Sequence, residues 1–177
     1  MSKIETPLLK KFLKNAGDKL AGNWVLLGGS VIPLLGENIR TTHDIDLAGF
    51  GPKEQAQTLK LLELAENLQL PIEAINQAAG FFLQKIPNWK GDLILIQRGA
   101  KASIYRPNAT LYLCLKLNRF SESDLDDCLA MIRIAKNLKE AVDRERLIKA
   151  IHTRRSKDDH ALTKRLDLLT ARLKVRK

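Results

Sequence analysis

The sequence predicts an α+β protein in which helices flank a small mixed β-sheet and the C-terminal part is helical. The first hundred residues contain short apolar runs of strand length, which alternate with segments whose apolar residues recur at helical spacing. After Pro107 only the helical spacing remains. We therefore expect an α/β core with an N-terminal helix over 1–106 and a basic helical region over 107–177.

The first elements follow from local patterns. Apolar residues at helical spacing predict an amphipathic helix over 6–21. The continuous apolar run at 24–27 is bounded by glycines and predicts a buried strand. A short helix is expected to begin at Ser30, which is a good N-cap, because Pro33 is tolerated only in a first turn.

The later elements follow from the same rules. Acidic and apolar residues alternate over 44–50, as in a strand. A glycine-containing turn at 99–101 separates two apolar runs and predicts a hairpin. The remaining predicted elements are a helix over 53–69, a strand over 71–76, hairpin strands over 92–98 and 102–106, and helices over 107–119, 122–140, 143–154 and 159–174.

Composition narrows the class of protein. The chain has 177 residues, of which 45% are hydrophobic and 28% charged, as in ordinary globular domains. No apolar run approaches the roughly 18 residues of a membrane span, and the N-terminus lacks the pattern of a signal peptide. The two cysteines, Cys114 and Cys128, have neither disulfide-framework nor zinc-ligand spacing. These features predict a cytoplasmic protein without membrane contact.

Two short motifs carry the chemistry. Gly28-Gly29-Ser30 lies between a predicted strand and a helix, where glycines allow close backbone approach to a phosphate. Asp44 and Asp46 are two apart on a predicted strand, so both carboxylates lie on one face and suit Mg²⁺. Each motif alone is also typical of a tight turn or of a polar strand edge. Their order and spacing together favour a nucleotide site.

Together these motifs resemble the nucleotidyltransferase superfamily whose prototype is DNA polymerase beta. The run from Arg40 to Leu47 (RTTHDIDL) is similar to that of a narrower bacterial group, which includes AbiEii-type toxins of toxin–antitoxin systems. The resemblance implies the nucleotidyltransferase fold, a nucleoside triphosphate substrate, Mg²⁺ or Mn²⁺ bound by Asp44 and Asp46, and phosphate binding at 28–30. It further implies supporting roles for Arg40 and Thr42, and an antitoxin protein as a partner.

A second block also resembles the bacterial group. Its pattern of Lys-x-x-Arg followed by Asp-x-x-Asp matches Lys116, Arg119, Asp124 and Asp127. The two cations would neutralise triphosphate charge, and the two acids, on one helical face, would orient them. The alternative is that the acids stabilise a helix N-terminus and that the cations are ordinary surface residues.

The superfamily usually adds a third carboxylate from a neighbouring strand. Glu73, in the predicted strand 71–76, is the candidate, and Asp92 is its rival. His43 points away from the aspartates on a strand and is more typical of a neutral packed or exposed histidine. If neither acid reaches the metal site, activity would be weakened or lost.

The charge is concentrated at the C-terminus. The whole chain carries +10, and residues 144–177 hold twelve lysines and arginines against four acids, an excess of +8. This excess predicts a nucleic-acid face, with Arg154, Arg155, Lys164 and Arg165 as its candidates; a face that only aids solubility is the alternative. We therefore expect transfer of a nucleoside monophosphate to an RNA (tRNA-like) or protein hydroxyl. The alternatives are a catalytically inactive module that binds nucleotide or RNA, and an interaction protein whose basic tail binds an acidic partner.

Overall fold

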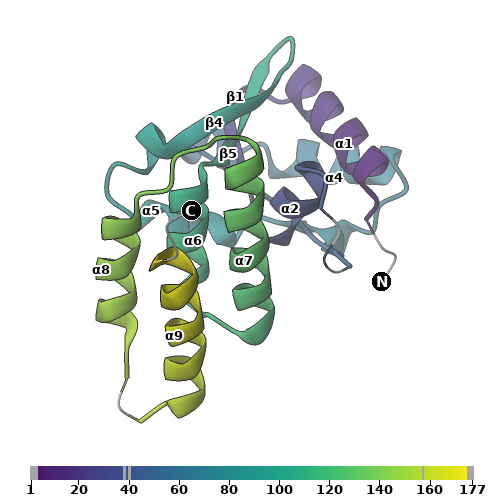
Figure 1. Cartoon of the computed structure of the whole chain (residues 1–177). Coiled ribbons are helices and arrows are strands. Elements are labelled where there is room, and N and C mark those ends of the chain that lie inside the picture. The colour runs from purple at the N-terminus through teal and green to yellow at the C-terminus, as the bar shows by residue number, and fades with distance from the viewer. Residues whose placement is uncertain (1–3, 38, 40, 157, 175–177) are drawn as a thin grey trace. The chain divides into compact units, whose positions relative to one another are not determined.

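The structure is a computed structural model that describes residues 4–37, 39, 41–156 and 158–174. The chain divides into two compact units, Met1–Pro107 and Asn108–Lys177. The N-terminal unit contains the β-sheet, and the C-terminal unit is helical (Figure 1). This is the α+β class that the sequence predicts.

The strands of the N-terminal unit form one mixed sheet in the order β3-β2-β1-β5-β4. The central strand β1 is antiparallel to β2 and parallel to β5, while β3 is parallel to β2 and β4 is antiparallel to β5. Because β1 is central, its apolar run from Trp24 to Leu27 is buried. The strands are β1 (Gly22–Leu27), β2 (Ile45–Gly49), β3 (Ile75–Asn76), β4 (Leu93–Arg98) and β5 (Ala102–Pro107).

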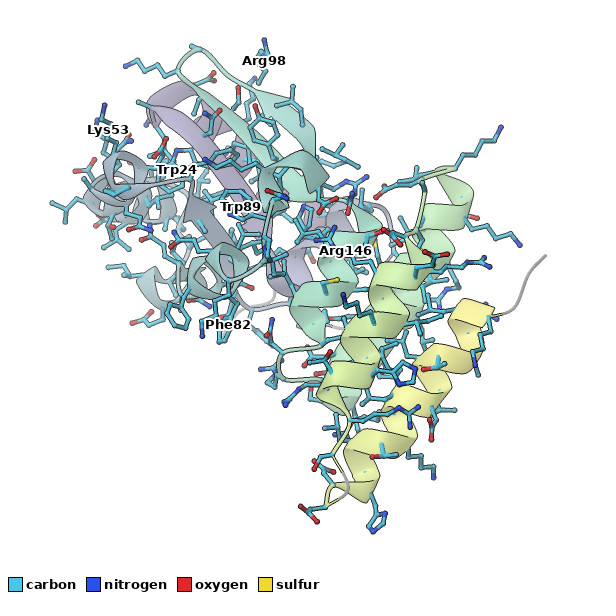
Figure 2. All side chains as sticks on the ribbon, turned by 90° about the vertical axis from the view of Figure 1, so that its left-hand side faces the viewer. Trp24, Lys53, Phe82, Trp89, Arg98 and Arg146 are labelled. Carbon is cyan, nitrogen blue, oxygen red and sulfur yellow. The ribbon has the colours of Figure 1, made fainter. Side chains whose placement is uncertain are left out.

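Helices and short 3₁₀ turns surround this sheet. The helix α1, the longest in the described part of this unit, buries Leu9, Phe12 and Leu13 and contacts β4 and β5. Trp24 and Trp89 are both buried, whereas Lys53 and Arg98 point outward (Figure 2). The elements are α1 (Thr6–Lys19), η1 (Gly28–Ser30), α2 (Val31–Leu34), α3 (Pro52–Gln55), α4 (Thr58–Asn67), η2 (Ile72–Ala74), α5 (Ala79–Gln84) and η3 (Trp89–Asp92).

Two predicted elements of this unit differ from the structure. The expected helix over 53–69 is broken into α3 and α4 near Gln57, whose side chain bonds to both the N–H and the C=O of Ala21. The expected strand over 71–76 is mostly wrong: the chain forms the turn η2 and reaches β2 only at Ile75 and Asn76. The hydrogen bonds of Gln57 to Ala21 and the pairing of β3 with β2 both join segments that are distant in sequence. Local sequence patterns do not predict such contacts.

The described residues of the C-terminal unit form four packed helices. The helix α6 contacts α7 and α8, and α9 contacts α7 and α8. Apolar residues of α9 at helical spacing, from Leu162 to Leu173, are buried as the sequence predicts. The helices are α6 (Ala109–Lys116), α7 (Glu122–Asn137), α8 (Arg144–Arg154) and α9 (His160–Lys174). Among the described helices of both units, none has the length and apolarity needed to cross a membrane.

Candidate active site

The two predicted motifs meet at the end of strand β1. Leu27, the last residue of β1, is the register partner of Asp46 in β2. Gly28 follows with φ +61°, a left-handed conformation that glycine adopts without strain. A Cβ atom at residue 28 would lie 1.7 Å from the Oδ2 atom of Asp46. The carboxylate of Asp46 therefore rests directly against the glycine turn, in space that any other residue would fill.

A second contact joins the two motifs through Ser30. Its hydroxyl donates a 2.6 Å hydrogen bond to the backbone carbonyl of Asp44, and its side chain is buried. The expectation that Ser30 caps the following helix is wrong, because Ser30 has helical backbone angles and its side chain makes no capping bond. Gly29 lies between these two contacts, half-buried in the turn η1. The serine thus fixes the glycine turn to the start of β2.

The aspartates differ in their surroundings. Asp44 immediately precedes β2 and is exposed, whereas Asp46 lies within β2 and is half-buried. The Nδ2 group of Asn76 donates a 2.6 Å hydrogen bond to the Oδ1 atom of Asp46. Asn76 is also the register partner of Asp46 on β3, and its Oδ1 atom accepts a bond from the backbone N–H of Ala78. Asn76 and Gly28 therefore contact opposite oxygens of the Asp46 carboxylate.

Asn76 is the site residue that the sequence analysis missed. Asn76 lies inside the predicted strand 71–76, in which the acidic residue Glu73 is the predicted site residue. The available signal was a polar residue at the carboxyl end of a strand beside the Asp-x-Asp strand. Its pairing with Asp46 depends on the register between segments 30 residues apart, which the sequence pattern alone does not supply.

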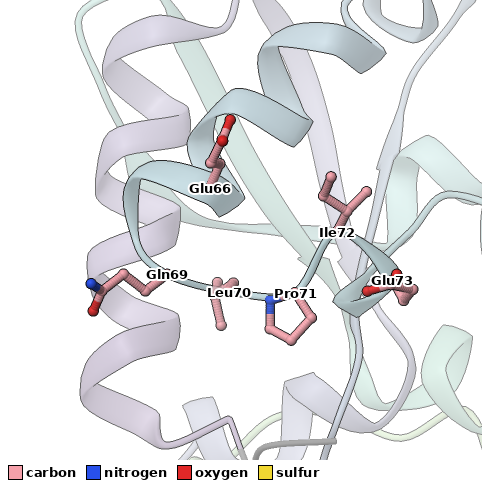
Figure 3. A pocket seen from close by; sticks show the side chains of 6 residues that line it. All are labelled: Glu66, Gln69, Leu70, Pro71, Ile72 and Glu73. Atoms are coloured by element: carbon pink, nitrogen blue, oxygen red, sulfur yellow. The ribbon is translucent and has the colours of Figure 1, made fainter.

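The structure does not bring a third acid to the aspartates. Glu73 is exposed on the turn η2, where it lines a pocket of about 450 Å³ with Glu66, Gln69, Leu70, Pro71 and Ile72 (Figure 3). Asp92 precedes the edge strand β4, which β1 and β5 separate from β2. Within the described part of the chain, no three His, Cys, Asp or Glu side chains form a group that could hold a metal ion. The assignment of Glu73 as the third carboxylate is therefore not supported by its position.

The remaining residues predicted around this site have different environments. Thr42 is buried, and no hydrogen-bond partner is found for its hydroxyl within the described residues. Its backbone carbonyl accepts a bond from the N–H of Ile4, which fixes the loop before β2. His43 is exposed. Arg40, the other predicted supporting residue, lies outside the described residues.

The second block forms a compact ionic cluster within the C-terminal unit. The Nζ atom of Lys116 lies 3.1 Å from Asp124 and 2.6 Å from Asp127, and Arg119 bonds to both oxygens of Asp124. The Asp124 carboxylate also accepts the backbone N–H of Ser121 in a capping box. The acids thus hold the two cations in place and also stabilise the start of α7.

Electrostatics explain why this cluster tolerates burial. The side chains of Asp124 and Asp127 are 3% and 1% exposed, and that of Lys116 is 11% exposed. Burial alone raises the pKa of Asp124, but hydrogen bonds from Arg119 and the positive charge of Lys116 outweigh it and hold this pKa well below its usual range. Within the described contacts, Lys116 is neutralised by two carboxylates; Arg119 is the more accessible cation, with 75% of its side chain exposed.

All three of the predicted nucleic-acid-binding arginines are bonded inside their own unit. Arg154 donates to the carbonyls of Leu117 and Asn118, just beyond the end of α6. Arg165 donates to the carbonyl of Phe120, and Arg155 forms an ion pair with Asp167. The bonds of Arg154 and Arg165 satisfy backbone carbonyls in the loop between α6 and α7. Lys164 is exposed.

The residues at the glycine turn fit a divalent cation of the Mg²⁺ class. Asp44 and Asp46 supply hard carboxylate oxygens, and Mg²⁺ commonly binds through one or two carboxylates together with substrate phosphates. A family model described as "Nucleotidyltransferase of unknown function (DUF6036)" matches residues 7–170. The chain belongs to this family. No curated protein and no solved structure matches the chain. The matched span of this nucleotidyltransferase includes the glycine turn, both aspartates and Asn76. The narrower likeness to AbiEii-type toxins is not part of that match.

The contact between Gly28 and Asp46 leads to a testable prediction for this nucleotidyltransferase. Changing Gly28 to alanine is expected to reduce nucleotidyl transfer about 100-fold, because the new methyl group must displace the Asp46 carboxylate by an ångström or more. The measurement is the rate of label transfer from an α-labelled nucleoside triphosphate.

Gly36 provides the matched control for this substitution. Its φ is also positive, at +94°, but a Cβ there meets no atom of the described residues within 4 Å. Changing Gly36 to alanine therefore adds the same kind of backbone strain, about 1–2 kcal/mol, without touching the aspartates. Equal losses of activity in the two variants would contradict the role of Gly28.

Proposed function

We propose that this nucleotidyltransferase transfers a nucleoside monophosphate from a nucleoside triphosphate to an RNA. The acceptor is a hydroxyl group at the accessible end of a tRNA-like molecule. The observation that carries the proposal is the contact of the Asp46 carboxylate with the Gly28 turn. At this contact an acidic side chain lies beside a glycine backbone that a phosphate can approach closely. Asp44 lies two residues before Asp46, immediately before β2, and its backbone carbonyl accepts the hydrogen bond from Ser30.

The chain's own residues have distinct tasks in this reaction. The acceptor hydroxyl attacks the α-phosphorus, the bond to the bridging oxygen breaks, pyrophosphate leaves and the hydroxyl proton passes to solvent. Gly28 and Gly29 admit the triphosphate close to the backbone, and Ser30 keeps the turn joined to β2. Asp44 and Asp46 would hold the divalent cation. When bound, that cation neutralises charge on the phosphates and favours deprotonation of the acceptor.

The direct test is a transfer assay with the full chain. Each α-labelled ribonucleoside triphosphate is incubated with the protein, Mg²⁺ or Mn²⁺, and either total RNA or a protein extract. Label in RNA together with released pyrophosphate is the expected result. Label in protein would replace the RNA acceptor with a protein hydroxyl, and no transfer to either acceptor would overturn the proposed activity.

A second candidate function is a nucleotide- or RNA-binding module without catalysis. The observation that favours it is the amide of Asn76 beside Asp46, together with the lack of a third acid at the aspartates in the described part of the chain. Such a module would bind nucleotide in calorimetry and release no pyrophosphate. The transfer assay therefore separates the two candidates.

The choice of RNA as acceptor rests on the basic helices of the C-terminal unit. Arg154, Arg155 and Arg165 have intramolecular partners, so exposed cations elsewhere on α8 and α9 are better placed to contact phosphates. Lys149, Lys164 and Arg172 are exposed.

The likeness of residues 40–47 to toxin sequences supports a toxin-like role with an antitoxin partner, and that role rests on the motif alone.

The RNA acceptor leads to a salt-dependence prediction. Changing Lys149, Lys164 and Arg172 to glutamine is expected to weaken tRNA binding and to lower the slope of log affinity against log salt by about 0.7 to 0.9 per lost phosphate contact. Fluorescence anisotropy of labelled tRNA at several salt concentrations measures both quantities.

A triple change of Lys10, Lys11 and Lys14 on α1 is the control. These lysines are exposed and belong to the other unit. Changing them to glutamine removes the same total charge as the first triple change. If both triple variants change the slope equally, the effect is one of net charge and the basic helices are not the RNA face.

A further inference from the structure

The position beside Asp46 on the neighbouring strand is occupied by an amide. Asp46 and Asn76 are register partners on the parallel strands β2 and β3, so their side chains lie on the same face of the sheet. The Nδ2 and Oδ1 atoms of Asn76 are both engaged, with Asp46 and with the N–H of Ala78. A carboxylate at this position would face Asp46 directly.

We propose that Asn76 stands where a third metal-binding carboxylate would otherwise be, so that Asp44 and Asp46 bind a divalent cation firmly only together with a triphosphate. The inference rests on the proposed function, because it takes the glycine turn as the place where the triphosphate lies. It concerns how the site is completed, which the family assignment does not address.

Ligand number supports this inference. Mg²⁺ requires six oxygen ligands in near-octahedral geometry and gives up its water reluctantly. Two aspartates carry two negative charges between them, and one oxygen of Asp46 already accepts a hydrogen bond from Asn76. The described residues offer no third His, Cys, Asp or Glu to the pair. The remaining ligands therefore come from water and from the phosphate oxygens of the substrate.

Asn76 also positions the carboxylate of Asp46. An acid at residue 76 could do so only with a cation bound between the two carboxylates. Its N–H group attracts the Asp46 carboxylate at 2.6 Å, and Gly28 borders the other oxygen. Two carboxylates at that separation would repel each other in the absence of metal. The amide keeps Asp46 in one orientation in the empty site, ready for the cation that arrives with the nucleotide.

The test uses Mn²⁺ alone and compares the full chain with Asn76→Asp. Free Mn²⁺ is measured by its electron paramagnetic resonance signal, without nucleotide. The parent chain is expected to bind Mn²⁺ weakly, and Asn76→Asp about tenfold more tightly, because an added carboxylate raises the ligand charge of the site. The melting temperature of Asn76→Asp should be below that of the parent chain without metal and should rise more steeply with Mn²⁺.

Two further variants guard against a merely structural effect. Asn76→Ala removes the hydrogen bond to Asp46 without adding charge, and should gain no Mn²⁺ affinity. Asn76→Asp combined with Asp46→Asn restores an amide–acid pair with the partners exchanged, and should lose the gain. If Asn76→Asp binds Mn²⁺ no more tightly than the parent chain, or if Asn76→Ala binds as tightly as Asn76→Asp, the inference is overturned.

A calorimetric titration examines the triphosphate side of the inference. The α,β-methylene analogues of the four ribonucleoside triphosphates are titrated into the parent chain with Mn²⁺ and with a chelator. Mn²⁺-dependent binding of an analogue supports the inference. Analogue binding that is equally tight with the chelator overturns the inference alone, whereas no analogue binding in Mn²⁺ and no label transfer would overturn the proposed function as well.

Discussion

Changing Asp44 and Asp46 together to asparagine is expected to abolish nucleotidyl transfer. The two carboxylates are the acids at the glycine turn, and in the proposed function they hold a divalent cation. Loss of such a cation would cost several kcal/mol in the transition state, or about a thousandfold in rate. The expected rate therefore lies at the background of the transfer assay. Both an α-labelled triphosphate and pyrophosphate release should report the loss.

The fold should survive this double change. Asparagine has nearly the shape of aspartate, and at position 46 its carbonyl can still accept the hydrogen bond from Asn76. Removal of two neighbouring like charges should leave the melting temperature unchanged or slightly higher. Circular dichroism and thermal unfolding measure both properties, so a loss of activity cannot be mistaken for unfolding.

A matched pair of acids on α4 controls for charge. Glu63 and Glu66 are exposed, belong to the same unit and are changed to glutamine together. This variant should transfer nucleotide at the parent rate. Transfer at the parent rate by the Asp44/Asp46 variant would remove the aspartates from the active site.

Changing Asp124 to alanine is expected to destabilise the C-terminal unit by about 3–5 kcal/mol. The substitution removes one buried carboxylate partner of Lys116, both bonds of Arg119 to that acid, and the capping box at the start of α7. Loss of one member of a buried ion pair has a cost of this size, because the remaining charge is left less well compensated. Urea unfolding of the full chain, followed by circular dichroism, measures the change.

Asp126 is the control for this prediction. It lies on the same helix, two residues from Asp124, and is exposed. Its change to alanine should alter the free energy of unfolding by no more than about 0.5 kcal/mol. Equal effects of the two substitutions would show that the cluster contributes no more than an exposed acid.

The same cluster predicts an acid sensitivity with a defined sign. The pKa of Asp124 is lower in the folded chain than its ordinary value of about 3.9. The unfolded chain therefore binds the proton first as the pH falls, and the stability that Asp124 provides at neutral pH is lost progressively below about pH 4. Asp124→Asn should show a smaller loss of stability than the parent chain between pH 5 and pH 2.

The cluster also bears on the predicted phosphate role of Lys116 and Arg119. Pairing with Asp124 and Asp127 gives Lys116 a structural function that accounts for its position. The side chain of Arg119 is 75% exposed, so a phosphate could approach its guanidinium group. The test is the affinity of a folded Arg119→Ala variant for the α,β-methylene triphosphate analogues. If this affinity equals that of the parent chain, the cluster has a structural role alone.

The sequence by itself determined the parts of this protein that depend on local chemistry. Period-two alternation in 44–50 and the glycine-bounded apolar run at 24–27 predict the strands that carry the two motifs, because side-chain direction alternates along any strand. The capping box at Ser121 and the apolar faces of the last two helices are likewise local patterns. They suffice for the α+β class, the helical C-terminal part, and the Gly28 and Asp46 motifs.

Only the tertiary structure decided which distant residues meet these motifs. Asn76 reaches Asp46 because β3 pairs with β2 in one register, and Glu73 misses it because the chain turns through η2 before pairing begins. Arg154 and Arg165 bond to carbonyls in the loop between α6 and α7 because α8 and α9 pack within the same unit as that loop. Register and packing are set by contacts between segments some 30 to 45 residues apart. A local pattern shows which face of an element a side chain occupies, but not what lies opposite it.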